Sequence, residues 1–110
     1  MNNPPVEESL DPADWEALRR LAHQAIDDGF DHLQGVRDRP VWQPVPEAVV
    51  ARLRQPAPRL PQGAESAYRE FKEIVMPYSI GNTHLRFWSW LIGSGPPFAA
   101  VGDCLGEELS

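Results

Sequence analysis

The stretch HLRFWSWLIGSGPPFAAVGDCL, residues 84–105, combines an aromatic cluster, an apolar run and a glycine-rich hinge. Phe87, Trp88 and Trp90 fall within four residues, and no charged side chain occurs between Phe87 and Gly102. Aromatic residues most often pack within their own chain, but a contiguous apolar surface is also typical of interfaces and ligand sites. Because a short, proline-rich chain has little core with which to cover this surface, we expect another polypeptide surface to cover it.

The length allows one domain at most, and the composition is acidic. The chain has 110 residues, a net charge of −6 and twelve prolines, six of which lie between residues 40 and 61. An acidic chain without a basic cluster is a poor candidate for nucleic-acid binding, which phosphate neutralisation drives. No apolar run approaches the roughly 20 residues of a membrane span, and residues 1–12 lack the features of a signal peptide. The single cysteine, Cys104, cannot form an internal disulfide, so we expect a reducing, cytoplasmic location.

A long amphipathic helix is predicted after a disordered lead-in at residues 1–10. Asp11 is a good N-cap, and Pro12 suits the first helical position. Apolar residues then recur at steps of three and four as far as about Leu33 or Arg37. They are Trp15, Leu18, Leu21, Ala22, Ala25, Ile26, Phe30 and Leu33. A lone helix of this kind is marginal in water, so its stripe should pack against another surface.

Two proline-rich linkers divide the rest of the chain. Residues 39–46 and 55–63 are expected to be extended, because the residue before a proline disfavours helical geometry. The pattern predicts a short helix over residues 47–53 and a third helix over residues 64–76 that ends at Pro77.

The C-terminal part contains a turn, a strand-like stretch and a last helix. The turn is predicted at residues 78–83, the strand-like pattern covers residues 84–92, and the last helix begins at Pro96 or Pro97. The predicted fold class is all-α: an extended helical flap of three to four helices joined by proline-rich linkers over residues 11–110. We expect this flap not to be a compact independent globule.

Two pairs of side chains could carry chemistry. His23 and Asp27, four residues apart on a helix, could share a metal, but no third ligand is evident and charged residues on a solvated face are common. Cys104 with His84 could suggest a thiol nucleophile, but no orienting third group can be named, and cysteines are usually packing residues. We therefore predict no metal site and no catalytic residue.

The glycine-rich hinge and the single lysine could each suggest a function, but the sequence gives little support for either. Gly93-Ser94-Gly95 ahead of a helix has the outline of an anion cradle, but no phosphate-binding glycine motif is present. Lys72, the single lysine, is the only side chain that could form a Schiff base. Its place on the charged face of a helix should keep the amine protonated and solvated, so we do not expect it to act as a nucleophile.

The order and spacing of the segments resemble those of a known protein family. The first helix ends in RDRPVW, a short helix follows, and then come a YREFKEIVMPY helix, a G-N-x-H-x-R-F-W-x-W segment and a helix of the form PFAxxxDxL. This order resembles the N-terminal segment of pyridoxal-phosphate-dependent amino-acid decarboxylases of the aromatic-L-amino-acid decarboxylase type (group II). The resemblance covers nearly the whole chain, residues 11–109.

The resemblance implies a helical flap that wraps over the neighbouring subunit and builds much of a dimer interface. The implied partner is a second copy in a homodimer or the catalytic domain of a decarboxylase, with no nucleic acid and no membrane. The implied substrate-binding positions are Trp90, Leu91, Ile92 and Gly93. The interface positions expected on the first helix are Trp15, Leu18, Ala22, Ile26 and Phe30.

The resemblance also implies pyridoxal phosphate as the cofactor of the full-length family. The Schiff-base lysine, the stacking histidine and the aspartate that pairs with the pyridine nitrogen lie downstream in that family and do not fit within 110 residues. We therefore expect a fragment or a truncated gene product that binds no cofactor alone and decarboxylates nothing alone. The alternative is a stand-alone helical protein-interaction module that binds its partner through the first helix.

Overall fold

A computed structural model describes residues 9–79, 81–84, 86 and 95–109 of the chain. Its α-helices are α1 (Trp15–Gln34), α2 (Glu47–Leu53), α3 (Ala64–Ile74) and α4 (Pro97–Leu109). Two short 3₁₀ helices, η1 (Val36–Asp38) and η2 (Met76–Tyr78), follow α1 and α3. The described residues contain no strand, which confirms the all-α prediction. Of the stretch predicted as strand-like, only His84 and Arg86 are described, and both lie in a bend or turn.

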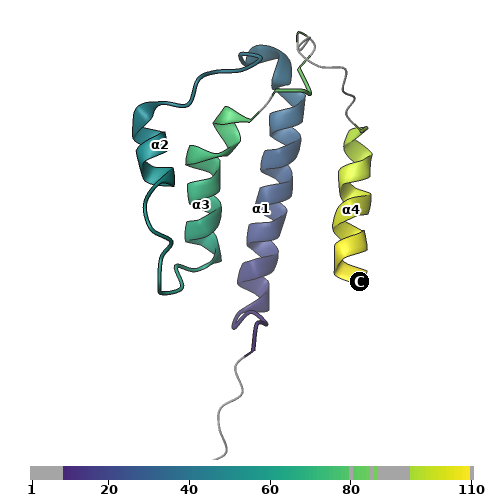
Figure 1. Ribbon diagram of the computed structural model, residues 1–110. Helices are drawn as coiled ribbons and strands as arrows, with labels where there is room; N and C mark the ends of the chain where they lie inside the picture. Colours follow the sequence, from purple (N-terminus) through teal and green to yellow (C-terminus); the bar gives the residue numbers. More distant parts are fainter. Residues whose placement is uncertain (1–8, 80, 85, 87–94, 110) are drawn as a thin grey trace, which may run out of the picture.

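The long helix α1 runs through the middle of the molecule, with α3 and then α2 on one side and α4 on the other (Figure 1). The radius of gyration is 18.4 Å, well above the roughly 13 Å of a compact domain of about 100 residues. Among the described residues Ile74 is the only buried apolar side chain. The chain is therefore an extended helical layer rather than a closed globule. None of the described helices combines the length and apolar character needed to cross a bilayer.

Helix α1 begins one turn later than the sequence predicted. Asp14, not Asp11, is the N-cap: its backbone is extended, and its Oδ1 accepts a hydrogen bond of 3.1 Å from the Ala17 amide. That bond satisfies one of the amides that a helix start leaves without a partner, and Glu16 in the first turn favours the same end of the dipole. Pro12 therefore precedes the helix. The predicted end is confirmed, because α1 stops at Gln34.

The remaining helices follow the proline punctuation. Helix α2 has the predicted bounds, with Pro46 as its N-cap. Helix α3 ends at Ile74, two residues earlier than predicted, and Pro77 lies within η2. Helix α4 begins at Pro97, one of the two predicted starts. Arg52 joins α2 to α3 through contacts of 3.5 Å to each of Glu70 and Glu73, and these exposed ion pairs contribute little stability.

Candidate functional site

The apolar residues of α1 divide between two faces. Leu21 and Ala25 are half-buried on the side that packs towards α3, where Asp28 also lies. The predicted interface residues follow one another at steps of three and four on a neighbouring face, and all are exposed in the single chain. They are Trp15, Leu18, Ala22, Ile26 and Phe30. Trp15 leaves 62% of its surface in solvent and Ile26 leaves 46%, so this chain alone does not cover the stripe.

A groove of about 340 Å³ separates the C-terminal half of α1 from α4. Ile26 and Phe30 of the predicted interface line its α1 wall, together with Gly29 and Leu33. The α4 wall consists of Ala100, Val101, Cys104, Leu105 and Glu108. A Cβ atom at Gly29 would meet nothing within 4 Å, so this wall has an open position. The stripe therefore has two parts. Ile26 and Phe30 face α4, whereas Trp15, Leu18 and Ala22 are exposed away from that groove, and Leu18 also lines a hollow shared with the start of α3.

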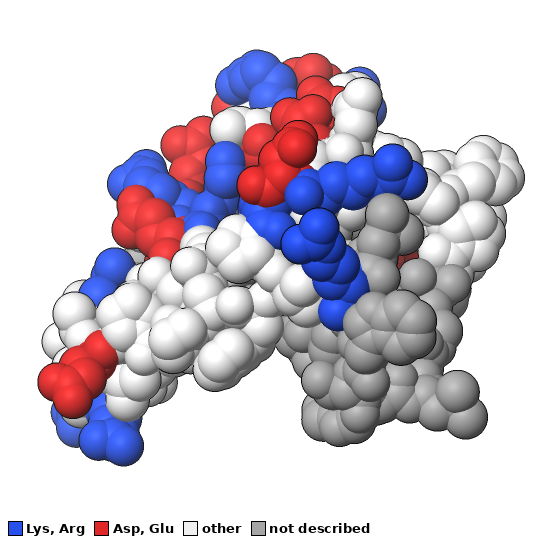
Figure 2. Space-filling view, turned by 90° about the horizontal axis from the view of Figure 1, so that it is seen from above, with Lys and Arg blue, Asp and Glu red and all other residues white. Residues whose placement is uncertain are grey.

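Helix α4 is exposed along its whole described length. Phe98 and Leu109 leave 80% and 86% of their surface in solvent, and Leu105 leaves 52%. A helix with apolar residues on most of its faces normally lies buried. Figure 2 looks down on this molecule and shows charged side chains of both signs intermingled in a band beside a broad uncharged area. The uncovered apolar surface of α1 and α4 is the main unexplained feature of the single chain.

Helix α3 is fixed to α1 by a polar cluster of Asp28, Tyr68 and Lys72. The Tyr68 hydroxyl donates to Asp28 Oδ2 at 2.5 Å, and Lys72 Nζ lies 3.0 Å from the same oxygen. Hydrogen bonds from Tyr68 and Lys72 hold the pKa of Asp28 below its ordinary value of 3.8. Burial, followed by the hydrogen bond to Asp28 and its negative charge, raises the pKa of Tyr68 to about 12. Lys72 is thus paired with a carboxylate across two helices, a contact that its Glu neighbours in the sequence do not reveal.

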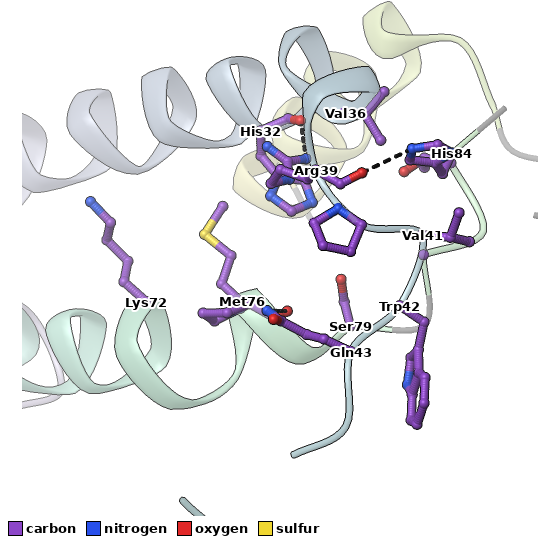
Figure 3. Close-up of a pocket in the computed structure, with 14 residues that line it drawn as sticks. His32, Val36, Arg39, Val41, Trp42, Gln43, Lys72, Met76, Ser79 and His84 are labelled. Atoms are coloured by element: carbon purple, nitrogen blue, oxygen red, sulfur yellow. Dashed lines mark hydrogen bonds between the residues drawn. The ribbon is translucent and has the colours of Figure 1, made fainter. Parts of the chain in front are cut away.

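A second polar cluster, here called the junction, joins residues 39–43 of the first linker to residues 81–84. His84 Nε2 donates to the Arg39 carbonyl oxygen at 3.0 Å, and Arg39 donates to the His32 carbonyl oxygen at the end of α1 (Figure 3). Gln43 Nε2 donates to the Pro77 carbonyl oxygen at 3.0 Å. The first linker, residues 39–46, is therefore held in place by hydrogen bonds to α1, η2 and the turn.

A cavity of about 220 Å³, partly open to solvent, lies at the junction. Among its lining residues are Val41 and Trp42, two apolar residues of the linker, while Lys72 and His84 lie on opposite sides of it (Figure 3). Burial and, to a smaller extent, the charge of Arg39 lower the pKa of His32 from its ordinary value. The cavity lies where α1 and α3 both end, and the hydrogen bond from Arg39 to the His32 carbonyl oxygen helps to satisfy the carbonyl end of α1.

The other candidates from the sequence do not form a site in the described part of the chain. There, no three His, Cys, Asp or Glu side chains gather closely enough to hold a metal ion. Cys104 is exposed, with its Sγ 3.7 Å from Glu108 Oε1, and it lines the α1–α4 groove. His84 lines the junction cavity instead, so the two are not brought together. The predicted substrate-binding residues Trp90, Leu91, Ile92 and Gly93 lie outside the described residues, as does most of the glycine hinge.

Comparison with curated proteins shows a similarity to a plant decarboxylase. The chain is 30% identical over 106 residues to tyrosine decarboxylase 2 of Narcissus pseudonarcissus, and the match covers 96% of the chain. It covers 20% of that enzyme, so the chain spans about a fifth of the length of this relative. No protein-family model and no solved structure matches the chain. The chain is thus distantly similar to one segment of a decarboxylase.

Proposed function

We propose that this chain is the dimerisation and substrate-pocket-lining flap of a pyridoxal-phosphate-dependent amino-acid decarboxylase. The observation that carries the proposal is the uncovered apolar stripe of α1, from Trp15 at 62% exposure to Phe30 at 40%. The similarity to a tyrosine decarboxylase covers 96% of the chain but only a fifth of that enzyme. It supports the proposal, because the chain then corresponds to one segment of a larger enzyme. A segment that small is expected to be completed by other surfaces.

The dimer contact of this proposal uses the open half of the stripe. Trp15, Leu18 and Ala22 lie one turn apart on α1 and do not line the groove towards α4. In a two-fold dimer the same patch on each copy would meet itself, which places α1 against α1 of the partner. Large aromatic and aliphatic side chains around a small alanine allow close approach of two helices. The α1–α4 groove remains available to the catalytic domain.

The pocket-lining role belongs to Trp90, Leu91, Ile92 and Gly93. Their aromatic and aliphatic side chains suit the ring of an aromatic amino acid, the substrate class that the name of the relative suggests. The junction supports this role, because it anchors the chain at His84 and Arg86 shortly before these positions. The proposed substrate class is therefore an aromatic amino acid.

The described residues do not fit pyridoxal phosphate itself. A Schiff base requires an amine that can lose its proton, whereas the one lysine, Lys72, has its ammonium 3.0 Å from the Asp28 carboxylate. The amine is therefore already engaged by a carboxylate of α1 within this chain. In the proposal the catalytic domain supplies all groups that hold the cofactor, and this chain contributes shape and apolar lining. The chain alone is then inactive.

A stand-alone interaction module would use the same exposed stripe, so the two functions must be separated by reconstitution. The test removes the matching fifth from the Narcissus tyrosine decarboxylase and adds this chain as a separate polypeptide with pyridoxal phosphate and L-tyrosine. We expect release of CO₂ only when the chain is present. An Ala22→Glu chain should fail to restore activity, and a Gln24→Glu chain, changed on the opposite face, should succeed. Dimer formation by the chain with no effect on the truncated enzyme would support the module and overturn the flap.

A further inference from the structure

His84 uses both ring nitrogens to join parts of the chain that lie far apart in sequence. We propose that His84 is a positioning residue that fixes the direction in which the chain leaves the junction through Arg86. The inference rests on the proposed function, because the positions that follow Arg86 are the proposed substrate-lining ones. The sequence pattern alone suggests only Cys104 as a partner for His84.

The first nitrogen connects the turn to α1. Nε2 donates to the Arg39 carbonyl oxygen at 3.0 Å, across 45 residues of sequence. Arg39 itself donates to the carbonyl oxygen of His32 in the last turn of α1. His84 is thus linked through one residue to the helix that carries the proposed dimer stripe.

The second nitrogen shapes the chain that follows. Nδ1 accepts a hydrogen bond of 3.0 Å from the Arg86 amide, two residues further on. Asparagine and aspartate side chains make the same contact in Asx turns, where the side-chain oxygen accepts from the amide two residues later. Because Nδ1 accepts and Nε2 donates, these two hydrogen bonds require the ring proton on Nε2.

The surrounding backbone leaves this histidine little room to move. Gly81 opens the turn with a φ of 77°, and its own carbonyl oxygen accepts from the His84 amide at 3.0 Å. A Cβ atom at position 81 would stand 1.8 Å from the Val41 carbonyl oxygen, so turn and linker are in direct backbone contact. His84 therefore holds Arg86 against a support that is itself fixed.

Two conservative substitutions separate the two contacts. His84→Asn keeps an acceptor for the Arg86 amide in Asx-turn geometry but is too short to reach Arg39. His84→Gln keeps a donor at the distance of Nε2 but loses the local turn. His84→Ala loses both. Because the asparagine and glutamine variants each keep one half of the linkage, the test does not depend on the alanine variant folding.

The first measurement is hydrogen exchange at the Arg86 amide in the full chain. Exchange in His84→Asn should match the wild type, whereas His84→Gln and His84→Ala should exchange roughly two- to tenfold faster, as expected for one lost hydrogen bond. Equal exchange in all four proteins would overturn the proposal.

The second measurement is KM against kcat for L-tyrosine in the reconstituted enzyme. Both single-contact variants should raise KM about two- to tenfold with kcat retained. A purely structural role would reduce the amount of active enzyme, lowering kcat and leaving KM unchanged, and that result would overturn the positioning role alone. A wild-type chain that restores no activity would overturn the proposed function, and the positioning role with it.

Discussion

Gly81 lies against Val41 so closely that a Cβ atom at position 81 would stand 1.8 Å from the Val41 carbonyl oxygen. Between the two residues lie the rest of the first linker, α2, the second linker, α3 and η2. Their contact closes the junction, and His84 and Gln43 add hydrogen bonds on either side of it. The path of the chain beyond α3 is therefore decided by a contact with the linker that follows α1.

Substitution of Gly81 by alanine should destabilise the chain by more than the same change at Gly63. Both glycines have positive φ, 77° and 85°, so alanine is strained at both positions, by about 1–3 kcal/mol. A Cβ at Gly63 meets nothing within 4 Å, whereas at Gly81 it meets backbone. We expect Gly81→Ala to cost about 1–3 kcal/mol more in free energy of unfolding, measured with urea. Equal costs would show that the junction is not closed in solution.

Tyr68 should ionise far above an ordinary tyrosine. Its pKa of about 12 has burial as its main cause and the Asp28 carboxylate as the next. Alkaline titration followed by the ultraviolet absorbance of the phenolate should show one late-titrating tyrosine, absent in Tyr68→Phe. In Asp28→Asn the pKa of Tyr68 should fall but stay above the ordinary value of 10, because burial persists. A pKa of Tyr68 at 10 in the wild type would contradict the α1–α3 contact.

Asp28 should make stability depend on acid pH. Its pKa is lower in the folded chain than the ordinary 3.8, so its contribution is complete above that value and is lost as pH falls through the folded pKa. The stability difference between wild type and Asp28→Asn, measured by urea unfolding, should therefore shrink below about pH 4. Asp27→Asn is the matched control on the same helix, because it removes one carboxylate and leaves the contact of Asp28 with Tyr68 and Lys72 in place. A difference that stays constant down to the lowest pH would refute this assignment.

The sequence was sufficient for the elements whose ends are marked by proline. Pro46 and the linker at residues 55–63 bound α2 at the predicted residues, and Pro97 starts α4. Local signals were ambiguous where two good caps compete: Asp11 and Asp14 lie three residues apart, and only the hydrogen bond to the Ala17 amide selects Asp14. Cap preference alone cannot rank two aspartates.

The polar contacts between distant segments were not predictable from periodicity. Lys72 was placed on a charged helix face, but nothing local indicates that Asp28, rather than its Glu neighbours, is its partner. The spacing of Tyr68 and Lys72, four residues apart, was the available signal that both reach one point on α1. The sequence suggests Cys104 as the partner of His84, although its two partners in the structure are Arg39 and Arg86. Contacts across 40 to 45 residues depend on the folded path of the chain, which no window of sequence contains.

Sedimentation equilibrium of the purified chain tests the central claim most directly. The wild type should dimerise in a concentration-dependent manner, because Trp15, Leu18 and Ala22 expose an apolar patch that a second copy would cover. Ala22→Glu places a charge in that contact and should weaken the dimer about 100-fold or more, whereas Gln24→Glu adds the same charge outside it and should sediment like the wild type. A folded wild-type chain that stays monomeric at every concentration, or an Ala22→Glu chain that dimerises as the wild type does, would contradict the proposed dimerisation flap.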